Sequence, residues 1–109
     1  MDLELLKLQH YRWLDQNFPD QTHEDAFMGV VEEVGELAHV ILKHKQQIRE
    51  FADKQHAQEV AADCVGDIII FLDGFCRGFG LSLPQVVSET WKDVKQRDWI
   101  KFPKDGLTK

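Results

Sequence analysis

The sequence predicts an all-α protein, a bundle of four to five helices, and three observations support this fold class. Apolar residues recur at helical spacing in four segments, capping residues and turn formers separate these segments, and no segment alternates as a strand would. The 109 residues suit one domain over 1–109, with a tail from about residue 100. Because so small a domain buries little apolar surface alone, we expect oligomerisation to complete the bundle.

A proline turn separates the first two predicted helices. Apolar spacing predicts the first helix over about residues 3–17. Pro19 then lacks a backbone donor and disfavours helix in the residue before it. Thr22 is a suitable N-cap, and Asp25 stands three residues later as in a capping box. These signals predict a second helix that runs from this cap to about Lys45.

Polar and glycine-rich segments delimit the other two helices. The polar stretch 46–55 predicts a loop, and the apolar residues after it predict a helix over about 56–78. Gly80 is a stop signal, because glycine readily adopts the left-handed conformation that ends a helix. Ser82 followed by Gln85 resembles another capping box, which predicts a last helix over about 83–99.

Composition limits the classes of function. The net charge of −6 argues against a general nucleic-acid binder, which needs basic surface, but not against a phosphate substrate bound through cations. The chain shows no signal peptide and no apolar run that could span a membrane, so we expect a cytoplasmic protein. Cys64 and Cys76 are expected to be reduced core residues, and the lack of a Cys-x-x-Cys pair argues against a cysteine–histidine zinc site.

Acidic residues lie beside the apolar face of the second predicted helix. At about 100° per residue, Glu33 lies next to Val34 and Leu37, with Glu36 on the flank and Glu32 further round. Glu33 has no basic residue one turn away to pair with it. Such acids are often only the solvated edge of a helix, so this cluster alone would not indicate a site.

The third predicted helix repeats the pattern. Glu59, Asp63 and Asp67 are spaced i, i+4, i+8 and form one stripe, and the apolar run 68–72 follows Asp67 at once. Two unpaired acid clusters on neighbouring helices would repel each other unless cations lie between them. Carboxylate oxygens suit magnesium or manganese, so the sequence predicts a site for such an ion.

Three segments resemble a known family. Residues 32–37 read EEVGEL and resemble the EExxE motif of the MazG-like family, the all-α nucleoside triphosphate pyrophosphohydrolases. Residues 63–72 read DCVGDIIIFL and resemble its second motif, and GLSL at 80–83 matches the turn that follows. The similarity extends over roughly residues 22–99, most of the chain.

The second motif departs from the family pattern. The usual form is Glu-x-x-Asp, but the residue three before Asp67 is Cys64, a poor magnesium ligand. Asp63 gives Asp-x-x-x-Asp instead, and an i, i+4 pair still shares one helix face. Asp63, Glu59 or both therefore replace the missing glutamate.

The resemblance implies a reaction and a set of roles. It implies magnesium-dependent hydrolysis of a nucleoside triphosphate between the α and β phosphates, with manganese as a substitute metal, in the house-cleaning of nucleotide pools. Glu33, Glu36 and Asp67 are the expected metal ligands, with Asp63 as the fourth. Glu32 is the candidate for orienting or deprotonating the attacking water.

Substrate binding needs cations and a flat apolar surface. Lys92, Lys95 and Arg97 are candidates for binding phosphate, and a solvated basic face near a helix end explains them equally well. Trp13 is the first candidate for stacking on the base. Three other aromatic side chains are weaker candidates: Phe18, His23 and Trp91. Family members are dimers or tetramers, so we expect a homodimer or homotetramer that binds neither nucleic acid nor membrane.

Two other functions fit some of these residues. Glu36 and His39 form Glu-x-x-His, a spacing used in di-iron helical bundles, but the only other candidate, Asp53 with His56, lies in the polar stretch. A non-enzymatic oligomerisation or adaptor module would use the same apolar faces, with the acids at their rim.

Overall fold

A computed structural model describes residues 1–107 of the chain. These residues form four α-helices and one short 3-10 helix, and no strand occurs among them, so the predicted all-α class is confirmed. The elements in chain order are α1 (Leu3–Asn17), α2 (His23–Gln46), η1 (Arg49–Ala52), α3 (Lys54–Gly78) and α4 (Leu83–Val94). None of the described helices is long and apolar enough to cross a bilayer.

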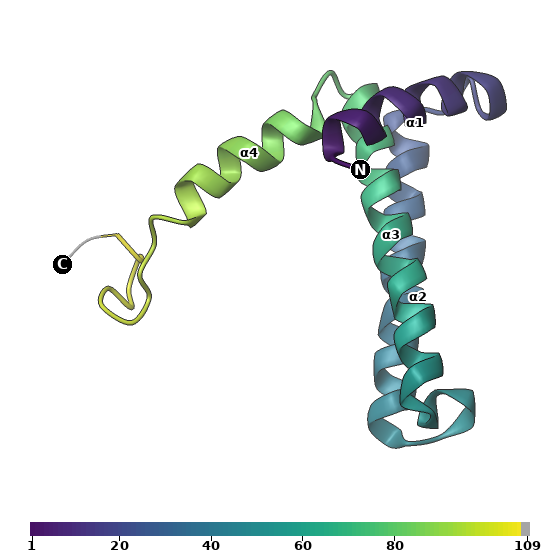
Figure 1. Cartoon of the computed structure of the whole chain (residues 1–109), viewed down its shortest axis with the longest axis vertical. Helices are drawn as coiled ribbons and strands as arrows, with labels where there is room; N and C mark the ends of the chain where they lie inside the picture. Colours follow the sequence, from purple (N-terminus) through teal and green to yellow (C-terminus); the bar gives the residue numbers. More distant parts are fainter. Residues whose placement is uncertain (108–109) are drawn as a thin grey trace.

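Helices α2 and α3 form a long antiparallel hairpin, seen as the vertical pair in Figure 1. The predicted capping box is present at its start, where Thr22 Oγ1 accepts from the Asp25 backbone N–H at 3.1 Å and the Asp25 carboxylate accepts in return. At the closed end, Val40, Phe51 and Ala57 form an apolar cluster. The segment predicted as a plain loop therefore contains η1, because burial of Phe51 orders it.

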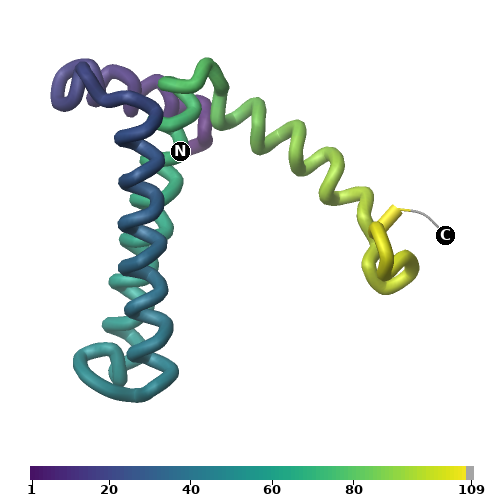
Figure 2. Tube along the Cα trace, turned by 180° about the vertical axis from the view of Figure 1, so that it is seen from behind, coloured from purple at the N-terminus to yellow at the C-terminus, as the bar shows by residue number. Residues whose placement is uncertain are grey.

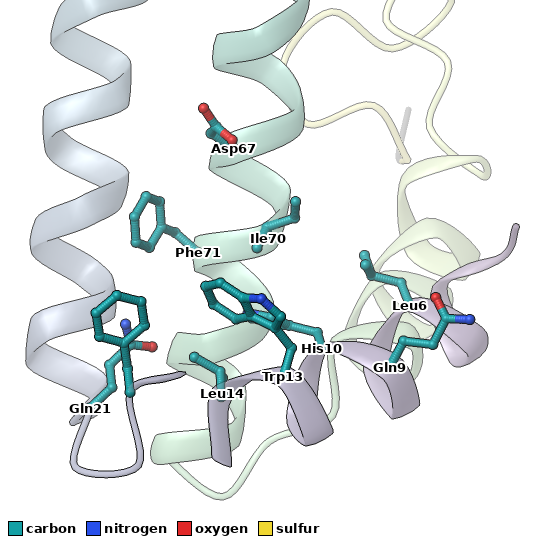
Figure 3. A pocket seen from close by; sticks show the side chains of 10 residues that line it. Leu6, Gln9, His10, Trp13, Leu14, Gln21, Asp67, Ile70 and Phe71 are labelled. Atoms are coloured by element: carbon teal, nitrogen blue, oxygen red, sulfur yellow. The ribbon is translucent and has the colours of Figure 1, made fainter. Parts of the chain in front are cut away.

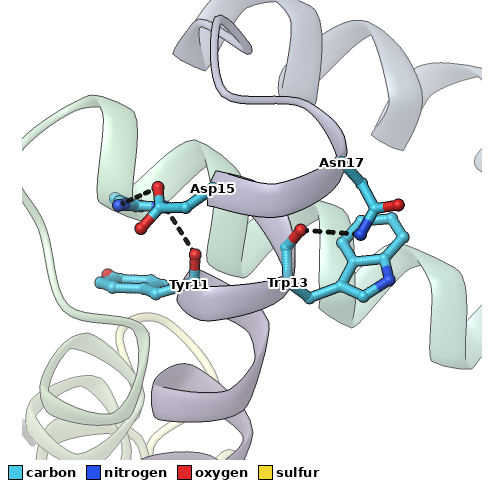
Figure 4. Close-up of polar contacts among 5 residues, drawn as sticks. Tyr11, Trp13, Asp15 and Asn17 are labelled. Atoms are coloured by element: carbon cyan, nitrogen blue, oxygen red, sulfur yellow. Dashed lines mark hydrogen bonds and ion pairs between the residues drawn. The ribbon is translucent and has the colours of Figure 1, made fainter.

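Helix α1 lies across the open end of the hairpin, against the last turns of α3. Arg77 of α3 donates to the Tyr11 backbone carbonyl at 3.0 Å and to the Asp15 carboxylate at 2.8 Å, and its guanidinium lies 4.6 Å from the centre of the Tyr11 ring (Figure 4). The buried carboxylate of Asp73 contacts His10 at 2.7 Å. These contacts fix the position of α1 on α3.

Helix α4 extends away from the hairpin, as Figures 1 and 2 show from opposite sides. It begins at Leu83, which is buried, but it ends at Val94 rather than near Trp99 as predicted. The segment after it forms turns, in which the Asp98 carboxylate accepts from the backbone N–H groups of residues 100 and 101. An aspartate that binds local backbone donors competes with helix, which explains why the helical pattern does not continue.

The predicted cap at the start of α4 is wrong. Ser82 precedes the helix but accepts no hydrogen bond from its first turn. Its Oγ instead accepts from Lys7 Nζ of α1 at 3.1 Å, and Gln85 bonds to Glu89 at 3.2 Å. A contact with α1, which the sequence does not reveal, has replaced the local one.

The chain exposes more surface than a compact domain of its size. Its accessible surface is 8166 Å², whereas about 6,200 Å² is usual for this length, and its radius of gyration is 17.5 Å against about 13 Å. The hairpin covers only one side of each helix, so many residues expected in the core are exposed. They include Leu5, Leu8, Trp13, Phe18, Phe27, Val31, Val34, Ile41 and Leu42.

Candidate metal centre and adjoining pocket

The acid clusters of α2 and α3 meet in the middle of the hairpin. One carboxylate oxygen each from Glu33 and Glu36 and the sulphur of Cys64 all lie within 4.8 Å of one another. Glu33 is 9% exposed and Cys64 is 2% exposed, whereas Glu36 faces solvent. The two sequence motifs therefore contribute to one group of possible ligand atoms.

The charges of both acid clusters act on the carboxyl of Glu33. Burial raises the pKa of its carboxyl above the ordinary 4.5, and the charges of Glu36, Asp67 and Glu32 raise it further. The Glu33 and Glu36 side chains also share a hydrogen bond that favours the protonated form. None of the ion pairs in residues 1–107 involves these four acids. A cation bound among these acids would lower the pKa of Glu33, because an opposite charge favours the ionised form of a carboxyl.

The thiol of Cys64 faces the same carboxylates. Its pKa is raised above 9.0, first by burial and then by the charges of Glu33, Glu36, Asp67 and Asp63. Asp63 and Asp67 are exposed, so they border the cluster on its solvent side. The chemistry of this donor set, four carboxylates that form no ion pair within residues 1–107, fits a divalent cation.

Glu59 and Glu32 occupy different places relative to the cluster. Glu59 accepts a hydrogen bond from Gln55 at 3.3 Å and is not among the charges that shift Glu33 or Cys64. Glu32 is exposed, and its charge acts on Glu33. Of the two acids that the sequence left open as the replacement for the missing glutamate, Asp63 acts on Cys64 and Glu59 does not, and neither belongs to the group of atoms within 4.8 Å.

A cavity of about 690 Å³ adjoins the cluster between α1 and α3 (Figure 3). Asp67 lies in its wall with Ile70 and Phe71 of α3, and α1 contributes His10 and Trp13. The remaining lining residues are Leu6, Gln9, Leu14, Phe18 and Gln21. The volume is in the range of pockets for small ligands, and the wall is mostly apolar. Asp67 therefore belongs to both the acid cluster and the pocket.

Trp13 is the main aromatic surface of the pocket. Its ring centre lies 6.1 Å from His10 and 5.6 Å from Phe18, and 47% of the residue is exposed. Of the other aromatic candidates, His23 packs edge-on against Phe79 at 5.0 Å and does not line the pocket. Trp91 lies on α4, in a separate shallow groove.

A buried aspartate–histidine pair lies beside the pocket, and the sequence analysis does not predict it. Asp73 is fully buried and its Oδ2 lies 2.7 Å from Nδ1 of His10, while its Oδ1 has no hydrogen-bond partner in the described chain. A signal was present, because Asp73 interrupts the most apolar part of α3. Its partner could not be chosen, because His10 is 63 residues away in the sequence.

The basic candidates lie apart from the acid cluster within one chain. Lys92, Lys95 and Arg97 stand at or after the end of α4, and all three are exposed. Because α4 leads away from the hairpin in both views, a single chain does not bring these residues to the acids (Figures 1 and 2).

The two histidines of the di-iron alternative lie away from the acid cluster, against Phe51 at the closed end of the hairpin. His39 meets the Phe51 ring edge-on at 5.7 Å, and His56 stacks on it at 5.4 Å. The carboxylate of Asp53 caps α3 by accepting from the Gln55 backbone N–H at 3.0 Å. Asp53 and His56 are therefore occupied by local structure and do not form a second motif facing Glu36.

Comparison of the chain with models of known protein families, with curated proteins and with solved structures finds no significant match. The resemblance to the MazG-like family therefore rests on the two acid motifs and the turn after the second.

Proposed function

We propose that this protein hydrolyses a nucleoside or deoxynucleoside triphosphate between the α and β phosphates, releasing a monophosphate and pyrophosphate. One observation carries the proposal: Asp67 belongs both to the acid cluster and to the wall of an aromatic pocket. Phosphates held through a cation at the acids would leave the base close to Trp13. House-cleaning of nucleotide pools is the role that follows from the resemblance.

The acid cluster is the proposed magnesium site. Glu33, Glu36, Asp63 and Asp67 would hold the ion, since magnesium prefers carboxylate oxygens, and manganese would substitute. The bound ion would supply charge neutralisation at the phosphates and a more acidic water. The pKa of Glu33, which burial raises first and the charges of Glu36 and Asp67 raise further, supports this assignment.

Glu32 and Trp13 have separate roles in this proposal. Glu32 is exposed next to the ligands, so it can orient the attacking water or accept its proton. Trp13 presents a half-exposed ring to the pocket, where a base can stack on it. Their variants should therefore affect different steps, catalysis for Glu32 and substrate binding for Trp13.

A second copy of the chain is the proposed partner, in a homodimer or homotetramer. The accessible surface of 8166 Å² exceeds that of a compact chain by roughly 2,000 Å², which matches what each subunit loses in an obligate homodimer. Val86, Val87 and Trp91 line an apolar groove on α4 that one chain leaves uncovered. Docking of α4 on a partner would carry Lys92 and its basic neighbours towards that partner's phosphate site.

A panel of nucleoside triphosphates, assayed with magnesium and with manganese, tests the reaction. We expect pyrophosphate release from at least one of them and none after chelation of the metal. Release of orthophosphate would overturn cleavage between the α and β phosphates. Sedimentation at micromolar concentration tests the proposed homo-oligomer, and a monomeric mass would contradict it.

The proposed nucleotide substrate and the two unpaired cysteines suit a cytoplasmic protein.

An adaptor module is the second candidate, favoured by the exposed apolar residues of α4. A thermal melt with and without magnesium and a non-hydrolysable triphosphate separates the two functions. A ligand at a hundred times its Kd stabilises the folded state by about 2.7 kcal/mol. If the protein is the proposed enzyme, we expect magnesium and the triphosphate to raise the Tm clearly. If it is an adaptor, we expect no rise.

A further inference from the structure

A single cysteine lies among the carboxylates of the candidate metal centre. The sequence argues against a zinc site built from cysteine pairs and histidines, and it marks Cys64 as a poor magnesium ligand. The structure nevertheless places the Cys64 sulphur within 4.8 Å of carboxylate oxygens of both Glu33 and Glu36. Cys64 stands where the related motif has a glutamate, so the departure changes the kind of atom offered to the metal.

We propose that the sulphur of Cys64 is a metal ligand, so that Glu33, Glu36 and Cys64 bind Zn²⁺ more tightly than Mg²⁺. The inference deepens the proposed function, since it names the preferred ion of the same metal centre. It concerns binding of the metal alone and needs no nucleotide.

The donor set supports a zinc-class ion. Zinc accepts cysteine sulphur and carboxylate oxygen together in four-coordinate sites, whereas magnesium requires six oxygen ligands in near-octahedral geometry. Thiolate ligands select zinc over the hard cations. Glu33, Glu36 and Cys64 thus offer three ligand atoms, two oxygens and one sulphur, and Asp67, whose charge acts on both Glu33 and Cys64, is the candidate for the fourth.

The distances are compatible with closure around an ion. Ligands at about 2.0 Å (oxygen) and 2.3 Å (sulphur) from a tetrahedral zinc lie about 3.5 Å apart. The three atoms already lie within 4.8 Å of one another, so small rotations of the glutamate side chains would bring them to that separation. Glu36 is exposed and free to make this adjustment, while Cys64 is held in the hairpin.

The burial of Glu33 is an independent sign of a ligand. Glu33 is only 9% exposed, faces the same point as Cys64, and has no basic partner in residues 1–107. A carboxylate in such a place is stable only if it stays protonated or binds a cation. Two largely buried side chains, Glu33 and Cys64, thus point at one site from different helices.

Cobalt titration of the full-length protein tests the sulphur ligand directly. Co²⁺ replaces zinc in such sites, and a cobalt–thiolate bond gives a near-ultraviolet charge-transfer band that oxygen and nitrogen ligands do not give. We expect the band in the wild type and in Cys76→Ser, and its loss in Cys64→Ser. Cys76 is the matched control, because it is also buried in α3 but lies twelve residues further along, outside the cluster. Cobalt binding to the wild type without this band would overturn the inference.

X-ray absorption at the zinc edge keeps the test independent of any variant. The zinc-loaded wild type should show a sulphur neighbour at about 2.3 Å. A shell made only of oxygen and nitrogen at about 2.0–2.2 Å would contradict a sulphur ligand. This measurement decides the matter even if Cys64→Ser fails to fold, which circular dichroism would reveal.

Calorimetry with the metals alone tests the preference. We expect the wild type to bind Zn²⁺ more tightly than Mg²⁺, and Cys64→Ser to lose about tenfold or more in Zn²⁺ affinity while its Mg²⁺ affinity is unchanged. An equal loss for both ions would contradict the proposal. The pyrophosphate assay tests the proposed function separately. A cobalt–thiolate band without hydrolysis would refute the enzyme and support the sulphur ligand. Hydrolysis without the band would support the enzyme and refute the sulphur ligand.

Discussion

Asp73 and Glu33 are both largely buried carboxylates, on the facing helices α3 and α2, yet their surroundings differ in charge. Asp73 is fully buried and lies 2.7 Å from the imidazole of His10. Glu33 instead faces Glu36, Asp67 and a thiol, and it forms no ion pair with the basic groups of residues 1–107. Burial of an acid therefore does not indicate a site by itself. The neighbours distinguish the two acids, since Asp73 has a hydrogen-bonding partner in His10, whereas Glu33 faces other carboxylates.

The two regions are also connected. The Asp73–His10 contact and the exposed Arg77–Asp15 pair hold α1 on α3, which sets the position of Trp13 in the pocket. The acid cluster contributes Asp67 to the opposite wall. The junction between α1 and α3 thus orients the aromatic surface relative to a cluster whose negative charges repel one another.

The largest expected effect is on turnover at the acid cluster. Glu32→Gln removes the group that orients or deprotonates the attacking water, and such groups contribute about 10²- to 10⁴-fold. We expect this loss in kcat with unchanged magnesium affinity and unchanged Tm, measured by pyrophosphate release and calorimetry. Near-normal turnover would remove Glu32 from the mechanism and leave the cluster as a metal site only.

Substitutions at the junction between α1 and α3 should lower the stability of the protein. Asp73→Ala leaves His10 buried without its hydrogen-bonding partner, and an unsatisfied buried polar group costs about 1–3 kcal/mol. Asp15→Ala breaks the exposed pair with Arg77 and should cost less than about 1 kcal/mol. Urea unfolding measures both. Similar losses for the two variants would show that Asp73 is not the structural carboxylate of the comparison.

Glu33→Gln should act in the opposite way to Asp73→Ala. It removes a ligand, so magnesium affinity should fall by about a hundredfold, while the metal-free protein should not lose stability, because a source of repulsion has gone. Glu24→Gln, an exposed change on the same helix, is the control. A metal-free Glu33→Gln protein that unfolds more easily than the wild type would make Glu33 structural after all.

Trp13→Ala should weaken substrate binding and leave the metal site intact. Stacking of a base on an aromatic ring is worth about 1–3 kcal/mol, so the KM should rise about tenfold. Leu8→Ala is the control, because Leu8 is exposed on the same helix outside the pocket. An equal rise in both variants would mean that the base does not lie in this pocket.

The smallest expected effect is a pH dependence of stability that comes from Glu33 in the acid cluster. Because the pKa of Glu33 is higher in the folded protein than the ordinary 4.5, the folded state binds a proton more tightly than the unfolded one. Its contribution to stability is therefore most favourable at low pH and is lost as the pH rises from about the ordinary value through the raised one. The difference between wild type and Glu33→Gln in metal-free urea unfolding should show this slope. A difference that grows in favour of the wild type with rising pH would contradict it.

The sequence by itself determined the features that depend on neighbours along the chain. The capping box at Thr22 and the left-handed turn at Gly80, with φ of 75°, are present as predicted. The spacing of Glu33 and Glu36, and of Asp63 and Asp67, was enough to place each pair on one face of its helix, because helical periodicity is a local property.

Only the tertiary structure decided which residues meet across helices. It paired Asp73 with His10, brought Cys64 close to Glu33 and Glu36, and made Ser82 a partner of Lys7 instead of a helix cap. These contacts join residues far apart in the sequence, and periodicity gives the face of a helix but not its partner. The exposure of apolar residues on the hairpin has the same explanation, since a helix face is buried only where another element covers it.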